Sequence, residues 1–498
     1  MTARSTMTTE PSVGGRGADY VALRVAWATL VMALMAAPSV RAGGPEVVVV
    51  KAASLHVGDG RVISSGMIVI RDGRVAAVGS ALVVPPEAEV IEVATGSITP
   101  GLIDANALLE PADLLPTPRP DPRAMASAAP AIPLEEIFGR AAQRRAHVEE
   151  EGDEIHPDHG PPAEPLITGR RGGLSLAEHA SEVVPHTRVI DSVDLRSPDL
   201  ARLLRGGVTT VYASPDSAAV IGSQGAIVRT GGPVADRVVR TTHGVKAVMG
   251  SDSYRVGRYN RAPWGRYVSI YTRRPNTRMG VSWVFRKAFY DADRYARSVP
   301  RHGADTPSDE ALAVLQQVRA GEIPLRIQAR LQHDILTALR VSDEFDLPFI
   351  LEEATDAYKC IDQIKARSVP VILGPIEDRA SRETRRFRLA TFRALREAGI
   401  VTALSALDRR DEDGLARQAM VAMRTGADLG EALRAVTQTP ARLLGLDKEI
   451  GTLEAGKRAD VVVWSGRPFA ADAKPVLVLI GGEVVWDQPQ RHINLPVA

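Results

Sequence analysis

The sequence predicts an α/β protein, a (β/α)8 TIM-type barrel with a small β-sandwich domain built from both chain ends. Strand-like runs alternate with helical patterns across residues 100–446, and such a stretch of roughly 350 residues suits a barrel with insertions. Short strand-like segments lie on either side, in residues 43–99 and 447–498. We therefore predict one β domain in two parts, with the barrel inserted between them.

The composition is that of a globular protein with no excess charge. Of 498 residues, 45% are hydrophobic and 24% are charged, which argues against a disordered or fibrous chain. Lys plus Arg number 61 and Asp plus Glu number 60, so we predict no nucleic-acid partner. The single cysteine, Cys360, excludes a disulfide framework and a cysteine-rich zinc site.

The first 42 residues resemble a secretory signal. Arg4, Arg16 and Arg24 precede an apolar stretch over residues 25–37, and a small-residue ending follows at residues 40–42. Because a membrane span needs about 20 apolar residues, a cleaved signal is favoured over a span. We predict a mature chain that starts near Gly43, is exported to the periplasm or beyond the cell, and has no stable membrane span. An uncleaved signal anchor is the alternative.

The strands of the β domain are predicted from short apolar runs and turn residues. Residues 47–50 form a continuous apolar run, and residues 66–79 read as two strands joined by a hairpin turn at residues 71–73. Near the other end, residues 459–465 and 475–486 repeat this character, with a Gly-Gly turn in the second segment.

The barrel elements follow in order along the middle of the chain. Strands are predicted at residues 208–212, 325–329, 348–352, 369–373 and 400–404, and helices at residues 334–346, 357–367, 380–398, 413–425 and 428–436. Residues 110–185 are proline-rich and read as an irregular insertion. This insertion follows the first strand, so we expect it over or beside the barrel mouth, where loops after strands lie. Residues 254–295 are rich in arginine and aromatic residues and read as a loop followed by a helix from residue 282 to 297, although such clusters can also bind sugars or single strands.

Four motifs identify a family resemblance. They are ITPGLID at residues 98–104, GGVTTV at 206–211, TPARLLGL at 439–446 and IGTLEAGKRADVVVW at 450–464. The chain resembles the amidohydrolase superfamily, in particular its imidazolonepropionase-like and prolidase-like branch. The resemblance implies a hydrolase of C–N bonds that holds zinc or a similar divalent metal at the barrel mouth, where the metal activates water.

The residues at the expected metal-ligand positions depart from the family pattern. Histidines are expected twice on the first strand, twice on the fifth and once on the sixth, and an aspartate on the eighth. In their place stand Asn106 and Leu108, Gln328 and Arg330, Glu353, and Leu407, with Asp408 as the alternative after a shift of one residue; Asp104 lies beside them. Leucine has no donor atom, and asparagine is a weak ligand for transition metals.

The sequence therefore predicts an amidohydrolase-family protein without a metal or other cofactor and without hydrolase activity. Its role would be to bind a small molecule or to partner an active paralogue, in a homo- or hetero-oligomer. The alternative is an active hydrolase of amide, cyclic amide or peptide-like bonds with a non-standard or relocated site. His156 and His159, in the insertion, could form an opportunistic metal site but read as solvated loop residues, and Cys360 reads as a buried structural thiol.

One substitution carries a structural prediction of its own. Arg330 should point into the barrel mouth, where acidic groups would otherwise be left without a cation. We predict that its guanidinium takes roughly the former metal position and pairs with Asp104, Glu352 or Glu353. The alternative is an outward-pointing Arg330 above a hydrated mouth.

Overall fold

The computed structural model describes residues 47–109, 181–255, 275, 277–297, 307–376, 389–407 and 411–488. The predicted signal segment, residues 110–180 of the predicted insertion, with His156 and His159, and Asp408 lie outside the described residues. Within the described part of the chain, no helix is long and apolar enough to cross a membrane.

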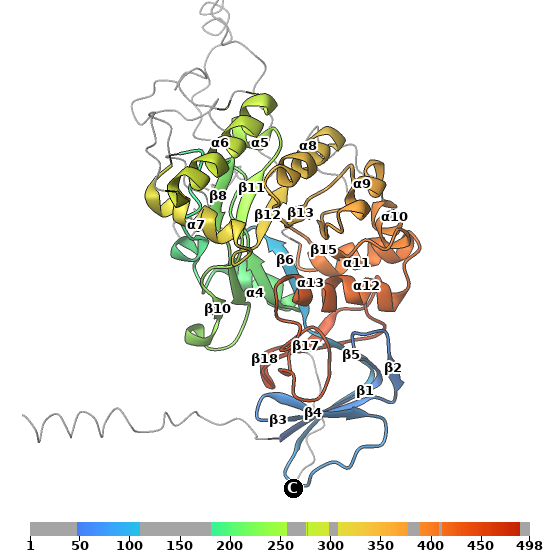
Figure 1. The fold of residues 1–498 in the computed structure, drawn as a ribbon. Coiled ribbons are helices and arrows are strands. Elements are labelled where there is room, and N and C mark those ends of the chain that lie inside the picture. Colours follow the sequence, from blue (N-terminus) through green and yellow to red (C-terminus); the bar gives the residue numbers. More distant parts are fainter. Residues whose placement is uncertain are drawn as a thin grey trace, which may run out of the picture. The chain divides into compact units, whose positions relative to one another are not determined.

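Both chain ends contribute strands to one eight-stranded sheet (Figure 1). Its strands from the first part are β1 (Val47–His56), β2 (Val62–Ser64), β3 (Met67–Arg71), β4 (Arg74–Gly79) and β5 (Glu89–Pro100). The second part adds β16 (Val461–Trp464), β17 (Pro475–Ile480) and β18 (Glu483–Asp487). The order is β18-β17-β16-β5-β1-β3-β4, with β2 on β1, so the two parts join where β16 pairs with β5. This pairing gives a single sheet, and it does not confirm the predicted sandwich.

The start of β1 is apolar at every position because hydrophobic side chains pack against both faces of the sheet there. Val48 and Val50 pack into one hydrophobic cluster, whereas Val47 and Val49 pack into another. Successive side chains of a strand point to opposite faces, so a strand covered on both faces is apolar at every position.

The middle of the chain forms two further sheets. In the first, β6 (Leu102–Ala107) runs parallel to β7 (Val208–Ala213), and β9 (Ala226–Arg229) and β10 (Val238–Arg240) extend it as antiparallel strands. The second has the order β15-β14-β13-β12-β11-β8. Its strands are β8 (Ile221–Gln224), β11 (Val245–Val248), β12 (Leu325–Gln328), β13 (Phe349–Glu352), β14 (Val371–Leu373) and β15 (Thr402–Leu404).

The α/β class is therefore confirmed, but the closed barrel is not. Strands β11 to β15 are parallel, as predicted, and the predicted strands lie within a few residues of the observed ones. The described strands form two separate sheets instead of one closed ladder. Their edges meet where the Leu108 amide donates to the Leu407 carbonyl at 3.0 Å. The sequence analysis missed β8 to β11, each of which pairs antiparallel to a neighbouring strand.

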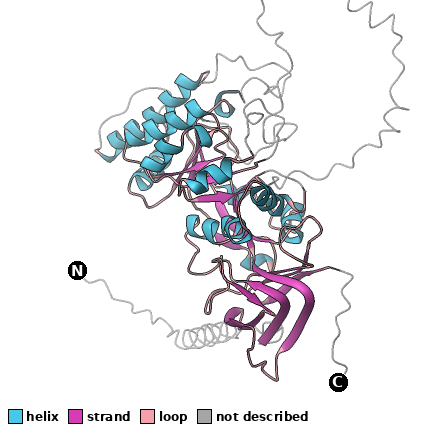
Figure 2. Cartoon of the chain, turned by 90° about the vertical axis from the view of Figure 1, so that its right-hand side faces the viewer, coloured by secondary structure: helices cyan, strands magenta, loops and turns pink. Residues whose placement is uncertain are grey.

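Helices cover the two middle sheets (Figure 2). They are α4 (Pro198–Arg205), α5 (Asp252–Arg255), α6 (Arg278–Ala296), α7 (Asp309–Arg319), α8 (Gln332–Asp343), α9 (Ile361–Ala366), α10 (Thr391–Glu397), α11 (Gly414–Arg424), α12 (Leu429–Val436) and α13 (Gln438–Leu443), with short 3-10 turns at Val189–Ser192, Val234–Asp236 and Ala357–Lys359.

Local chemistry accounts for several helix boundaries. Helix α6 begins four residues earlier than predicted, because the Thr277 side chain caps it by accepting from the Gly280 amide at 3.2 Å. Helix α12 begins at a capping box formed by Asp428 and Glu431. The predicted helix over residues 357–367 is divided at Cys360 into a 3-10 turn and α9.

The predicted insertion ends before residue 185, where it was expected to end. Val183 and Arg188 bridge to Ile221 and Gln224 of β8, so residues from 183 onward join the sheet region.

Candidate functional site

The predicted site positions lie at the ends of the parallel strands. Asp104 and Asn106 are on β6, Gln328 ends β12, Arg330 and Glu353 come just after β12 and β13, and Leu108 and Leu407 follow β6 and β15. All seven side chains are buried. The carboxyl ends of parallel strands are where functional groups of α/β proteins gather, so these seven positions define the candidate site.

Arg330 points inward and is paired on two sides. Its Nη2 and Nε atoms lie 2.6 and 2.9 Å from Glu353 Oε2, and its Nη1 atom lies 2.5 Å from Asp252 Oδ2. The predicted pairing with a nearby carboxylate is thus confirmed for Glu353, and the outward orientation is excluded. Glu353 has a φ of 57°, which is uncommon for a residue with a side chain and is typical of constrained positions at functional sites.

Lys246, on β11, is a second buried cation that the sequence reading missed. Its Nζ atom lies 3.4 Å from Glu352 Oε2 and 3.9 Å from Glu353 Oε1, and it donates to Ser214 Oγ at 3.0 Å. Its side chain is 1% exposed. The signal that could have found it is the single lysine in the apolar run VKAVM. Since lysine is almost never fully buried unless it is paired, a lysine in a buried strand indicates a carboxylate nearby.

Arg326, on β12, is the third buried cation. Its Nε atom lies 2.6 Å from Glu352 Oε1, its Nη2 atom donates to the Ala105 carbonyl, and its guanidinium carbon lies 3.7 Å from the ring centre of Tyr212. Neither partner of the Arg326–Glu352 pair is exposed. The neighbouring alternate position, Gln328, spans Asp252 and Ser217: its amide donates to Asp252 Oδ2 at 3.0 Å and accepts from the Ser217 hydroxyl.

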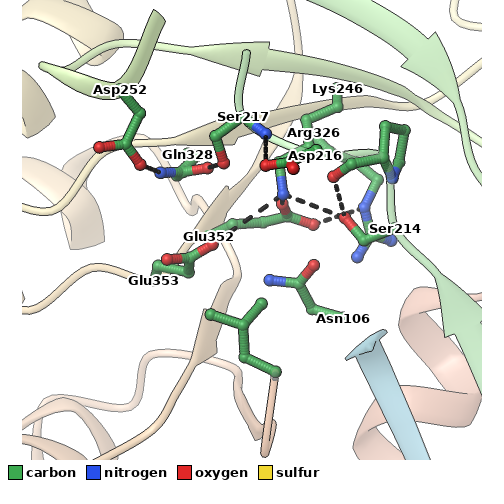
Figure 3. A network of polar contacts seen from close by, with 12 residues as sticks. Asn106, Ser214, Asp216, Ser217, Lys246, Asp252, Arg326, Gln328, Glu352 and Glu353 are labelled. Atoms are coloured by element: carbon green, nitrogen blue, oxygen red, sulfur yellow. Dashed lines mark hydrogen bonds and ion pairs between the residues drawn. The ribbon is translucent and has the colours of Figure 1, made fainter. Parts of the chain in front are cut away.

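These contacts form one continuous chain of alternating charges. We call it the ionic cluster, and it consists of Arg326, Glu352, Lys246, Glu353, Arg330 and Asp252, in the order of their contacts. Figure 3 shows five of its members, Arg326, Glu352, Lys246, Glu353 and Asp252. Three cations stand against three carboxylates. Buried charges are tolerated only when each is paired, which this alternation provides.

Asp104 has a different role from the one predicted. Its carboxylate accepts from the amides of Asn106, at 3.0 Å, and Ala406, at 2.9 Å, and so links β6 to the segment after β15. Burial raises the pKa of Asp104, while hydrogen bonds from Ser405 and from these amides act in the opposite direction. The described contacts of Arg330 include Glu353 and Asp252, and the suggested Arg330–Asp104 pair is not formed among them.

Asn106 has no hydrogen-bond partner for its side-chain carboxamide among the described residues. Its side chain is 1% exposed, and neither Oδ1 nor Nδ2 has a hydrogen bond. Figure 3 shows its carboxamide directed toward the charged side chains of the ionic cluster. A buried amide left without partners is costly, so this position is the natural place for a water or ligand atom.

The remaining candidate nucleophiles and bases do not complete a site. Burial raises the pKa of the Cys360 thiol to about 11, which keeps it protonated and agrees with a structural thiol. Burial also lowers the pKa of His243 to about 3. His333 is exposed in the first turn of α8, where its Nε2 atom lies 3.3 Å from Asp334 Oδ1. Within the described ranges, no three His, Cys, Asp or Glu side chains are grouped so that they could hold a metal ion.

Comparisons with known proteins agree with this architecture. A family model described as "Amidohydrolase family" matches residues 397–486. Amidohydrolase tasK of Hapsidospora irregularis is 25% identical over 346 residues, which cover 65% of this chain and 35% of that protein. Imidazolonepropionase of Brucella anthropi is 32% identical over 161 residues, which cover 31% of this chain and 38% of that protein. The matches thus span little more than a third of these curated relatives.

A solved structure extends the similarity to most of the chain. The crystal structure of an amidohydrolase from Thermotoga maritima MSB8 superposes with a TM-score of 0.68 at 26% identity, covering 89% of this chain and 100% of that one. The fold is therefore an α/β fold of the kind seen in that amidohydrolase. The chain belongs to the amidohydrolase superfamily.

Proposed function

We propose that this member of the amidohydrolase superfamily holds no catalytic metal, does not hydrolyse C–N bonds, and acts by binding a small molecule or an active relative. The observation that carries the proposal is the ionic cluster. In a metal centre, the carboxylates at the strand ends are neutralised by the metal ion. Here the protein's own cations lie beside them, since Arg330 contacts Glu353 twice and Lys246 lies between Glu352 and Glu353.

The three cations balance the three carboxylates, so no net negative charge remains to attract a divalent ion at this place. Two unit charges 4 Å apart interact by about 4 kcal/mol at the effective dielectric constant of a protein site, and a divalent ion doubles that repulsion for each neighbouring cation. The buried positions of Lys246 and Arg330, 1% and 4% exposed, leave them little freedom to move aside.

The donor atoms are also unsuited to the metal that the superfamily uses. Leu108 and Leu407 offer no donor, and the Gln328 amide is engaged by Asp252 and Ser217. Asn106 has free donor capacity, but one carboxamide is a weak ligand for zinc. The described residues therefore do not fit a zinc site, and no catalytic step is derived through one.

The second candidate function is an active hydrolase with a non-standard site, and the named relatives are equally compatible with it. One observation favours it: the unpartnered Asn106 amide faces Lys246 and two glutamates, groups that could bind and polarise an amide. Against it stands the burial of this group among the described residues, since Glu352 and Glu353 are only 0% and 2% exposed and offer little surface to a substrate.

Elemental analysis of the pure protein, prepared without chelators, separates the two readings. We expect far less than one zinc, iron or manganese per chain, and no turnover of N-acyl amino acids, dipeptides or cyclic amides above a no-enzyme control. One transition metal ion per chain, lost on chelation together with an activity, would refute the proposal. Metal-independent hydrolysis that disappears in Asn106→Leu would support the second candidate.

Three further expectations belong to the proposal. The relationship to amidohydrolases supports a (β/α)8 barrel in which the two middle sheets are parts of one wall, with the terminal sheet as part of a sandwich. The signal pattern of residues 1–42 supports export, with partners met in the periplasm or outside the cell. The proline-rich insertion would cover or flank the strand ends, and its removal by limited proteolysis should then change ligand access.

A further inference from the structure

A surface pocket of about 160 Å³ lies beside the ionic cluster, between the first turn of α6 and one face of α8. Met249 and Gly250, just after β11, form part of its wall and lead into α5, which begins at Asp252 of the ionic cluster. The carboxyl end of a strand at an α/β sheet is the usual place for a ligand. The other lining residues come from α6 and α8: Arg278, Met279, Val281, Ser282, His333, Asp334, Thr337 and Arg340.

The charged groups of the pocket favour an anion. Asp334 is the one acidic lining residue, and its oxygens are already held by Arg278, with Nε to Oδ1 at 2.8 Å and Nη2 to Oδ2 at 3.1 Å. His333 Nε2 lies 3.3 Å from the same carboxylate. Arg278 therefore neutralises Asp334, and Arg340 adds a positive charge that the pocket does not balance.

Arg340 has donor capacity to spare. Within the described part of the chain, no carboxylate lies within ion-pair distance of it, and its Nη2 atom makes only a long contact of 3.4 Å with Thr337 Oγ1. The nearest acidic residue on its helix end, Glu344, is bound by Arg286 through contacts of 2.5 and 2.6 Å. A guanidinium fork at a pocket edge is well suited to bind a planar carboxylate through two hydrogen bonds.

The helix that carries Arg340 lines the pocket along one face. Helix α8 has 12 residues, and His333, Asp334, Thr337 and Arg340 line the pocket from its first turn to its last. The first amide of the helix, that of Gln332, already donates to Asp356 Oδ2 at 3.2 Å, so the preference for an anion rests on Arg340 and not on the helix end.

Apolar side chains complete the lining. Met249 and Val281 are buried, whereas Met279 is 80% exposed at the pocket edge. Methionine side chains adapt to ligands of different shape, and an exposed methionine beside a cationic rim is typical of a site that covers a short hydrocarbon group.

We propose that this pocket binds a small organic carboxylate with a short branched or linear apolar group, with Arg340 as the anchoring cation. This inference names a ligand class for the binding role given above, but it uses none of the residues at the metal-ligand positions. It therefore holds or fails independently of whether the protein hydrolyses anything.

Isothermal titration of the full-length mature protein with 3-methylbutanoate tests the proposal. We expect saturable 1:1 binding that weakens with added salt, and no measurable binding of the matched neutral probe 3-methylbutan-1-ol. Inorganic phosphate serves as a third probe, and we expect it to bind at least about tenfold more weakly because it leaves the apolar lining unused. Binding of phosphate as tight as that of the carboxylate would overturn the assigned ligand class, and absence of any binding would overturn the site.

Two variants and one control assign the binding to this pocket. Arg340→Gln should weaken 3-methylbutanoate binding by about tenfold or more, since a charge-assisted hydrogen bond is lost. Ser282→Leu should obstruct the pocket and weaken binding to a similar degree. Arg393→Gln, which removes a half-exposed arginine from α10, is the matched control and should leave the affinity unchanged. Unchanged thermal midpoints establish that each variant is folded, and unaltered binding in both pocket variants would refute the location.

Discussion

Replacing Arg330 by methionine tests the ionic cluster directly. Methionine keeps the length of the apolar stem but removes the cation that contacts both Glu353 and Asp252. The two carboxylates are 2% and 9% exposed, so water cannot solvate them well after the change. Breaking a buried pair by removing one partner costs about 3–5 kcal/mol, because the other charge stays buried without compensation. We expect the free energy of unfolding to fall by this amount.

Urea denaturation followed by circular dichroism measures this loss. With an unfolding entropy of about 2.1 cal/mol/K per residue, the roughly 330 described residues should lose about 4–7 °C in melting temperature. Arg367→Met is the matched control, since its pair with Asp343 is 37% and 50% exposed and should contribute below about 1 kcal/mol. Combining Arg330→Met with Glu353→Gln should recover part of the loss, giving a coupling energy of about 0.5–3 kcal/mol. An Arg330→Met protein as stable as the Arg367→Met protein would refute the reasoning.

Three other predictions follow from named groups. Burial lowers the pKa of His243 to about 3, so between pH 6.5 and pH 3 the unfolded chain binds a proton that the folded protein does not. The free energy of unfolding should therefore decrease as the pH is lowered through that range. Denaturant titrations of His243→Gln should show a smaller decrease. The pKa of Cys360 is raised to about 11, so iodoacetamide at pH 8 should modify native protein only as fast as it unfolds, and rapid labelling of folded protein would contradict this. N-terminal sequencing of protein from its native host should find a start near Gly43, whereas an intact Met1 or Met7 on a soluble cytosolic species would disprove the signal.

Much of the fold could be predicted from local patterns. The hairpin at residues 66–79 appears as β3 and β4, and the strand at residues 348–352 appears as β13, because alternating or continuous apolar runs between turn residues reflect burial directly. The missed strands β8, β9 and β10 are only 4, 4 and 3 residues long, and each runs antiparallel to a neighbouring strand. Strands this short hold too few residues for a periodic apolar signal, and their antiparallel pairing departs from the strand–helix alternation that predicted the parallel strands.

The sequence by itself determined which side chains stand at the strand ends, because residue order fixes position along each strand. It left the partner of Arg330 open among Asp104, Glu352 and Glu353, and the structure selects Glu353. Only the tertiary structure decided the rest of the ionic cluster. Asp252 is 78 residues from Arg330, and Lys246 is more than 100 residues from Glu352, yet both complete the alternation of charges. The cation that pairs with a given carboxylate is set only when the strands pack side by side. Because these groups are buried, each charge needs a partner, and an unpaired charge in the interior would lower the stability by several kcal/mol.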